Sequence, residues 1–304
     1  MAYINRIILI IFILSLLIFS GNVFSQSNDK APNLLIKYEE LTSPEFIKAV
    51  IKSDSTCLIP IGVLEKHGPH LPLGTDLIDV REIALRAAKQ EYTIVYPGYY
   101  FSQIFEAKHQ PGTIAYSPQL ILNILQETCQ ELARNGLKKI ILVNGHGGNN
   151  HFLHFFCQIQ LEGPKDYSVI LFSPEDDPEV SKQISKLRQT RTGGHADEVE
   201  TSMMLSHRPD LVRTEQAKNQ SGRDLNRINN IPYGYTGIWW YAKFPNHYAG
   251  DGSYYNKEIG ELTINSRVNQ LVSLLKSLKT DKNIEQLQKK FFRESENPLE
   301  TKQD

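Results

Sequence analysis

The sequence has no excess of either charge and very little cysteine. Lys plus Arg number 33 against 34 for Asp plus Glu, so the net charge is -1. Nucleic-acid-binding proteins usually carry a basic stripe; no such stretch occurs, and we expect no nucleic-acid partner. The cysteines are Cys57, Cys129 and Cys157, and their odd number within apolar stretches argues against a disulfide framework.

Long apolar runs are also scarce, apart from one at the N-terminus. Arg6 precedes the largely apolar run of residues 7–19, and Val23-Phe24-Ser25 offers the small residues that a signal peptidase reads. The run is shorter than the roughly 20 residues that span a bilayer. We therefore predict that residues 1–25 are a signal peptide and that the protein is exported to the periplasm or secreted. An uncleaved membrane anchor is the alternative; after cleavage we expect no stable membrane partner.

Short apolar runs alternate with amphipathic segments along the rest of the chain. This alternation predicts βαβ units and a mostly parallel sheet. Predicted strands lie at 56–63, 92–96, 139–143 and 167–172, and predicted helices near 42–50, 79–90, 117–134 and 256–278. The hydrolytic domain is expected to span residues 34–280, with an irregular stretch rich in Tyr, Trp and Gly at 210–255. Residues 281–304 are expected to form a polar tail with a solvated face or a frayed end.

Ionisable residues directly follow the first predicted strand. Glu65 and His67 are two positions apart, so an extended backbone would direct both to one side. The Gly- and Pro-rich loop that follows can bring Asp76 to the same place. Glu, His and Asp form a ligand set suited to zinc, manganese or iron. The simpler alternative is a polar loop whose His and Asp only cap neighbouring backbone.

A Gly-rich string, Asn144-Gly-His146-Gly-Gly-Asn149, follows another predicted strand. Because parallel strands present ligand sites at their carboxyl ends, His146 is expected near the first cluster. A phosphate-binding turn is the rival interpretation. The spacing matches neither a P-loop nor a dinucleotide fingerprint, and no Lys-Ser or Lys-Thr follows. We therefore interpret His146 as a metal ligand.

A third string, His195-Ala-Asp197-Glu198-Val-Glu200-Thr-Ser, leads into an apolar helix. Buried carboxylates are costly unless they are paired or bind a cation. The helix dipole also favours acidic residues at a helix N-terminus. For this string taken alone, that explanation fits as well as a metal site. Together with the other two clusters, the string indicates a metal site.

These three ordered motifs resemble those of the creatininase (creatinine amidohydrolase) family. Weaker support comes from Pro111-Gly-Thr113 and Gly250-Asp251-Gly252, and the resemblance covers most of residues 40–280. It implies a three-layer α/β/α fold, a centre of two divalent cations and a homo-oligomer such as a hexamer. Zinc is the expected metal, with manganese or iron as alternatives.

The resemblance also implies a distribution of ligands. By motif position, Glu65 and His146 would hold one metal and His67 the other, with Asp76 bridging both. Creatininase itself has a metal-ligating Glu in the second motif, where this chain has Gly148.

Relatives with the Gly-Gly form carry a Glu after the His-Ala-Gly string. That position falls on Glu198 here, so Glu198 is assigned as the fifth ligand. Asp197 replaces the usual Gly and could change the charge at the site.

The implied reaction is hydrolysis of a non-peptide amide C–N bond, cyclic by preference, in a small molecule by a metal-activated water. His195 is the candidate that passes a proton to the leaving nitrogen. Glu200 is assigned to support a ligand carboxylate rather than to bind metal. The aromatic stretch 233–241 is a candidate pocket wall.

Other functions fit the same residues. A formamide deformylase or a metallopeptidase could use the same two-metal centre. A non-catalytic protein that binds a metal or small molecule is a different class, although the intact ligand set argues against it. A two-metal phosphoesterase would want Arg or Lys in the motifs to hold phosphate, and none occurs there.

Overall fold

The structure is a computed structural model that describes residues 34–302 of the 304-residue chain. The segment predicted to be a signal peptide, residues 1–25, lies outside the described residues, so cleavage and export stay predictions. Within residues 34–302, no helix combines the length and apolar character needed to cross a membrane.

The core of the fold is a four-stranded parallel sheet with the order β2-β1-β3-β4. Its strands are β1 (Thr56–Ile61), β2 (Ile94–Val95), β3 (Lys139–Asn144) and β4 (Ser168–Phe172). All four predicted strands occur, although β2 is shorter than the predicted 92–96. Along the β1–β3 ladder, Ile61 pairs with Asn144, so the carboxyl ends of these two strands lie side by side.

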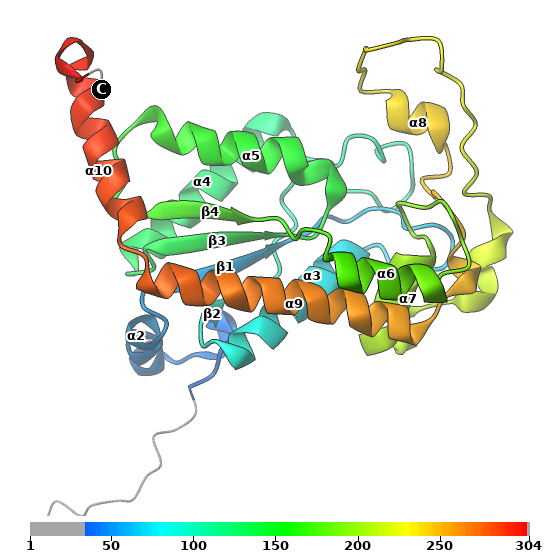
Figure 1. Ribbon diagram of the computed structural model, residues 1–304, viewed down its shortest axis with the longest axis horizontal. Helices are drawn as coiled ribbons and strands as arrows, with labels where there is room; N and C mark the ends of the chain where they lie inside the picture. The colour runs from blue at the N-terminus through cyan, green and yellow to red at the C-terminus, as the bar shows by residue number, and fades with distance from the viewer. Residues whose placement is uncertain (1–33, 303–304) are drawn as a thin grey trace, which may run out of the picture. The chain divides into compact units, whose positions relative to one another are not determined.

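Helices cover both faces of the sheet, which confirms the predicted three-layer α/β fold (Figure 1). One face packs against α3 and α9, and the other packs against α2, α4 and α5. The α-helices are α2 (Ser43–Lys52), α3 (Thr75–Gln90), α4 (Pro118–Arg134), α5 (Asn150–Ile159), α6 (Pro178–Leu187), α7 (Glu198–His207), α8 (Trp239–Lys243), α9 (Lys257–Thr280) and α10 (Asn283–Glu296). Short 3-10 helices occur in the irregular stretch before and after α8.

Local signals set the ends of several helices. Thr42 and Glu45 form a capping box at the start of α2, and Ser117 caps α4 through the amide of Leu120. Helix α3 begins at Thr75, four residues before the predicted start. This places Asp76 in its first turn, where the helix dipole favours a negative charge.

The expected polar tail includes a packed helix, α10. Gln288 lies against the edge strand: its amide donates to the carbonyl of Tyr167 at 2.9 Å and accepts from the hydroxyl of Ser168 at 3.0 Å. Phe292 is buried on the same helix. Most residues of α10 are exposed, as expected of a solvated segment, but residues 283–296 form a helix rather than a frayed end.

Candidate metal centre

The candidate site lies where the carboxyl ends of β1 and β3 meet. Glu65 and His67 follow β1, and His146 follows β3 on the neighbouring strand. Asp76 enters from the first turn of α3, and His195 comes from the loop before α7. All five residues are buried, exposing 7% of their surface or less. The parallel sheet thus gathers side chains that lie up to 130 positions apart in the sequence.

Two overlapping groups of these residues could hold a metal ion. Glu65, Asp76 and His146 form one, and Glu65, His67 and His195 form the other; in each, the potential ligand atoms lie within 4.8 Å of one another. In the first group, Nδ1 of His146 is 2.9 Å from Oε1 of Glu65 and 2.8 Å from Oδ2 of Asp76. The other oxygen of Asp76, Oδ1, is 3.0 Å from Nε2 of His67. Asp76 therefore reaches residues of both groups, as a bridging carboxylate would.

The buried carboxylates and imidazoles of the site compensate one another's charges. Burial alone would lower the pKa of His67, but the charge and hydrogen bond of Asp76 and the charge of Glu65 raise it to about 10. Burial would likewise raise the pKa of Glu65, yet the charge and hydrogen bond of His146 hold it well below its usual range. Buried carboxylates and imidazoles of this kind are stable only when paired or bound to a cation. The donor set, mixed carboxylate oxygen and imidazole nitrogen, fits zinc, manganese or iron.

Glu198 lies outside both groups, which does not fit its assignment as the fifth metal ligand. Its carboxylate accepts hydrogen bonds from the amides of Gln189 and Thr190, at 2.9 and 2.7 Å, and from the Thr190 hydroxyl at 2.7 Å. These bonds direct the carboxylate toward the segment that precedes α7. Glu198 thus anchors that segment instead of binding a metal.

Glu200 adjoins the centre instead. Its Oε2 accepts a hydrogen bond from the amide of Ala196 at 2.5 Å. Burial and the charge of Asp76 raise its pKa to about 8, and the charge of His67 opposes that rise. Glu200 lines a cavity of about 230 Å³ together with Asp76 and Arg267. Residues two apart on a helix point in nearly opposite directions, so Glu198 and Glu200 cannot both face this cavity.

Asp197 has a structural role at the start of α7. Its Oδ1 accepts from the amides of Val199 and Glu200 at 2.9 and 3.1 Å, which caps α7. Its Oδ2 pairs with the guanidinium of Arg188 at 2.9 Å. Its charge also contributes to the raised pKa of Glu200, in line with the prediction that Asp197, in place of the family's Gly, changes the charge at the site.

His195 belongs to the second metal group and is electrically neutral. Burial, together with the neighbouring charge of His67, lowers its pKa to about 3. Its Nε2 lies 2.8 Å from the carbonyl of Lys66, and its ring is 4.3 Å from that of His67. A neutral imidazole suits metal ligation, and the predicted catalytic role of His195 stays a prediction.

The motifs did not predict two residues that contact the metal groups, His247 and Glu106. His247 contacts Oε2 of Glu65 through its Nε2, and Trp240 donates to the Nδ1 of His247 at 2.9 Å. Of the aromatic stretch predicted to wall the pocket, Trp240 lies against His195, with ring centroids 5.9 Å apart. Tyr233, by contrast, is fully exposed. The only sequence feature that indicated a role for this segment was its concentration of aromatic residues.

The other residue without a signal is Glu106, in the loop after β2. Its Oε1 lies 3.9 Å from Nε2 of His146, and Gln103 donates to its Oε2 at 2.9 Å. A Cβ atom added to Gly148 would come within 2.4 Å of both the Glu106 carboxylate and the His146 ring. Gly148 therefore keeps open the space that Glu106 occupies beside His146.

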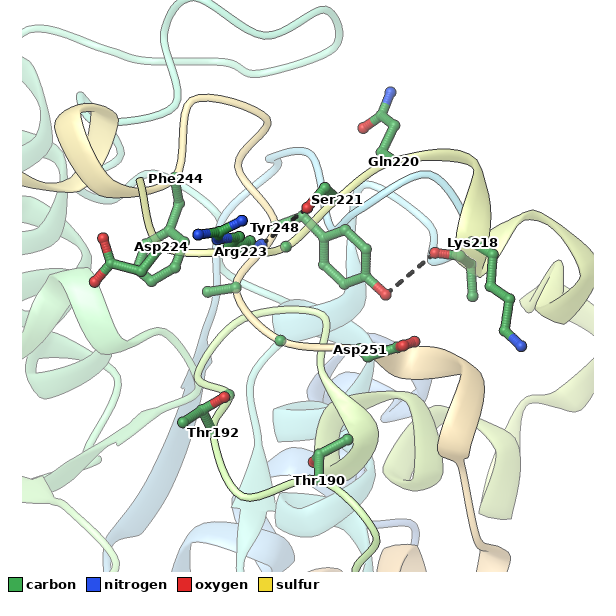
Figure 2. A pocket seen from close by; sticks show the side chains of 15 residues that line it. Thr190, Thr192, Lys218, Gln220, Ser221, Arg223, Asp224, Phe244, Tyr248 and Asp251 are labelled. Atoms are coloured by element: carbon green, nitrogen blue, oxygen red, sulfur yellow. Dashed lines mark hydrogen bonds between the residues drawn. The ribbon is translucent and has the colours of Figure 1, made fainter. Parts of the chain in front are cut away.

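A second cavity has a volume of about 600 Å³ (Figure 2). None of the described residues in either group lines it. Tyr248 stands in this cavity, where its hydroxyl donates to the carbonyl of Ala217 at 3.2 Å. Arg223 and Asp224 line another part of the wall. The smaller cavity is lined by Asp76 of the metal groups and by Glu200, so we place the candidate active site beside it.

Comparisons with known proteins agree with this geometry. The family model for creatininase, described as creatinine amidohydrolase, matches residues 39–275. A creatinine amidohydrolase of Pseudomonas putida is 30% identical over 209 residues, which cover 64% of this chain and 75% of that protein. A 3-dehydro-scyllo-inosose hydrolase of Thermotoga maritima is 27% identical, and the match covers 59% of each chain. A solved mutant creatininase of the Zn-Zn type shares the fold, with a TM-score of 0.67 at 24% identity over 81% of this chain and 99% of its own.

The fold and the buried groups define a metal-dependent hydrolase with an α/β/α architecture. The chain belongs to the creatininase family. The predicted family and enzyme class are thereby confirmed.

Proposed function

We propose that this protein hydrolyses a non-peptide amide C–N bond, cyclic by preference, in a small molecule, with two divalent cations held at the buried groups. The observation that carries the proposal is the overlap of two ligand groups: both include Glu65, and Asp76 contacts the imidazoles of His67 and His146. A single-metal site would need only one such group. The match to the creatinine amidohydrolase of Pseudomonas putida supports an amide substrate.

The chain's own residues have separate roles at the proposed centre. When bound, such cations would supply an activated water and a Lewis acid for the amide carbonyl. Glu65 and Asp76 fix the spacing of the two groups, and burial keeps bulk water from the ligand atoms. Glu200, whose pKa is raised to about 8, can hold a proton near neutral pH and faces the cavity. We therefore propose that Glu200, in place of Glu198, is the carboxylate that completes the site. We propose His195 as the group beside the leaving nitrogen.

Zinc is the proposed metal, and manganese or iron are alternatives. Imidazole and carboxylate donors accept all three. The solved creatininase of the Zn-Zn type supports the first choice. Metal analysis of protein purified without chelator should find about two equivalents per chain if both groups are filled.

Removal and return of the metal tests the proposal directly. Chelation should abolish hydrolysis of cyclic amides, and addition of Zn²⁺ or Mn²⁺ should restore it. If the chelated, metal-free protein turns over substrate equally well, the proposed mechanism is wrong.

A substrate panel separates the proposal from its alternatives. Cyclic amides, formamides and short peptides should be tested in parallel, because a deformylase or a metallopeptidase could use the same centre. Preferential cleavage of cyclic amides supports the proposal, and preference for formamides or peptides selects one of the alternatives. Metal binding without turnover of any of the three would favour a non-catalytic binding protein.

We further propose that the protein is exported and works as a homo-oligomer. Export rests on the N-terminal sequence, and fractionation of cells with an antibody against the mature chain tests it. Association is supported by exposed apolar side chains in the segment before and into α8, namely Ile231, Tyr233, Tyr235, Ile238 and Tyr241. Light scattering coupled to gel filtration measures the subunit number.

A further inference from the structure

His247 connects the metal centre to the aromatic segment around α8. It exposes only 2% of its surface, and both ring nitrogens are engaged. Trp240 donates from its indole nitrogen to Nδ1 at 2.9 Å, and Nε2 contacts Oε2 of Glu65. The other oxygen of Glu65, Oε1, lies 2.9 Å from Nδ1 of His146. One carboxylate therefore faces a metal-binding imidazole on one side and His247 on the other.

The tautomer of His247 follows from this chain of contacts. An indole N–H can only donate, so Nδ1 of His247 must accept. A neutral imidazole then carries its proton on Nε2, which donates to Glu65. While Trp240 makes its hydrogen bond, Nε2 has no lone pair to offer, so His247 cannot serve as a metal ligand despite its position beside Glu65.

The backbone at His247 has an unusual conformation. Its φ is 50°, a left-handed conformation that non-glycine residues adopt only a few per cent of the time. Uncommon conformations of this kind cluster at functional sites, where the surrounding structure fixes them. Here the amide of His247 donates to the carbonyl of Phe244 at 2.9 Å, and its carbonyl accepts from Gly68, next to His67, at 3.4 Å. The chain is thus bent to present this imidazole to Glu65.

We propose that His247 and Trp240 are positioning residues that orient Glu65 for metal binding. The inference rests on the proposed metal centre. Ligand carboxylates are usually held by hydrogen bonds from surrounding groups, and loss of such a partner typically weakens metal binding about 10- to 100-fold. Trp240 acts through His247, and the two tie the segment that contains α8 to the ligand atoms.

Two adjacent tryptophans provide a matched test. Trp240→Phe keeps an aromatic ring but removes the N–H that fixes the tautomer of His247. Trp239→Phe makes the same change one residue away, where no hydrogen bond of the indole is found among the described residues. We expect Trp240→Phe to raise the Kd for Zn²⁺ about 10-fold or more, measured by competition with a chromophoric chelator, and Trp239→Phe to leave it within about twofold.

A variant of His247 tests the second link. Asn tolerates a left-handed φ, so His247→Asn shortens the side chain without adding backbone strain. It should weaken Zn²⁺ binding at least as much as Trp240→Phe, and change the visible absorption of the Co²⁺-loaded protein. Circular dichroism verifies that each variant is folded.

The outcomes distinguish this inference from the proposed function. If wild-type protein binds no divalent cation, the metal centre itself is refuted. If wild-type protein binds Zn²⁺ and both Trp240→Phe and His247→Asn bind it equally tightly, only the positioning role falls. Equal weakening by Trp239→Phe and Trp240→Phe would also overturn it, because loss of ring packing would then explain the effect.

Discussion

Oδ2 of Asp76 lies 2.8 Å from Nδ1 of His146, although 70 positions separate the two residues. Asp76 lies in the first turn of α3 and His146 follows β3, so this contact exists only when the helix N-terminus packs over the carboxyl end of the sheet. The same carboxylate contacts His67 from its other oxygen. Asp76 thus links the two ligand groups in addition to Glu65, which belongs to both.

His146→Ala should therefore remove metal without unfolding the protein. The imidazole contributes ligand atoms to the first group, whereas the β1–β3 ladder does not depend on it. We expect metal content and amidase activity to be lost while the far-ultraviolet circular dichroism stays that of wild type. Full metal content in this variant would contradict the assignment of His146.

Glu198 and Glu200 should respond in opposite ways. Glu198→Ala removes a buried carboxylate that accepts three hydrogen bonds from Gln189 and Thr190, and should lower the free energy of unfolding by about 1.5–3 kcal/mol. Glu200→Gln should lower kcat about 10²- to 10⁴-fold while changing stability little. Urea denaturation and steady-state kinetics measure the two effects. The reverse pattern would return Glu198 to the metal site.

Gly148→Ala tests the space beside His146. The added Cβ would lie 2.4 Å from both Nε2 of His146 and Oε1 of Glu106, so at least one of them must move. We expect weaker Zn²⁺ binding and a fall in activity. Gly147→Ala is the control, because a Cβ there meets nothing within 4 Å. Similar behaviour of the two variants would show that the space at position 148 is not critical.

Acid should destabilise the protein partly through His70. Burial, with the charge of His67, lowers the pKa of His70 to about 4, and its Nε2 is 2.8 Å from the hydroxyl of Thr201. Between about pH 6.5 and pH 4 the unfolded chain binds a proton at this position and the folded protein does not. Stability from this group is therefore complete above pH 6.5 and falls by up to about 3 kcal/mol as the pH reaches 4.

The measurement is urea denaturation of metal-free protein between pH 7 and pH 4. His70→Gln cannot titrate, so its stability should fall less steeply over this range than that of wild type. Parallel curves for the two proteins would mean that His70 does not contribute.

Much of the fold could be predicted because its signals are local. Continuous apolar runs marked the strands, and Ser117 and Asn256 marked the starts of α4 and α9. The polar, exposed character of the tail was predicted, but the contact of Gln288 in α10 with the edge strand was not. Its partner, β4, is far away in the sequence, so no local pattern reveals the contact.

The sequence by itself determined the α/β class and the positions of Glu65, His67 and His146 after strands. It could do so because apolar runs and loop composition limit where such residues can lie. Only the tertiary structure decided that Glu200 faces the centre while Glu198 turns away, and that His247 supports Glu65. Those outcomes depend on the rotation of one helix and on a segment more than 180 residues distant, which no neighbouring residue specifies.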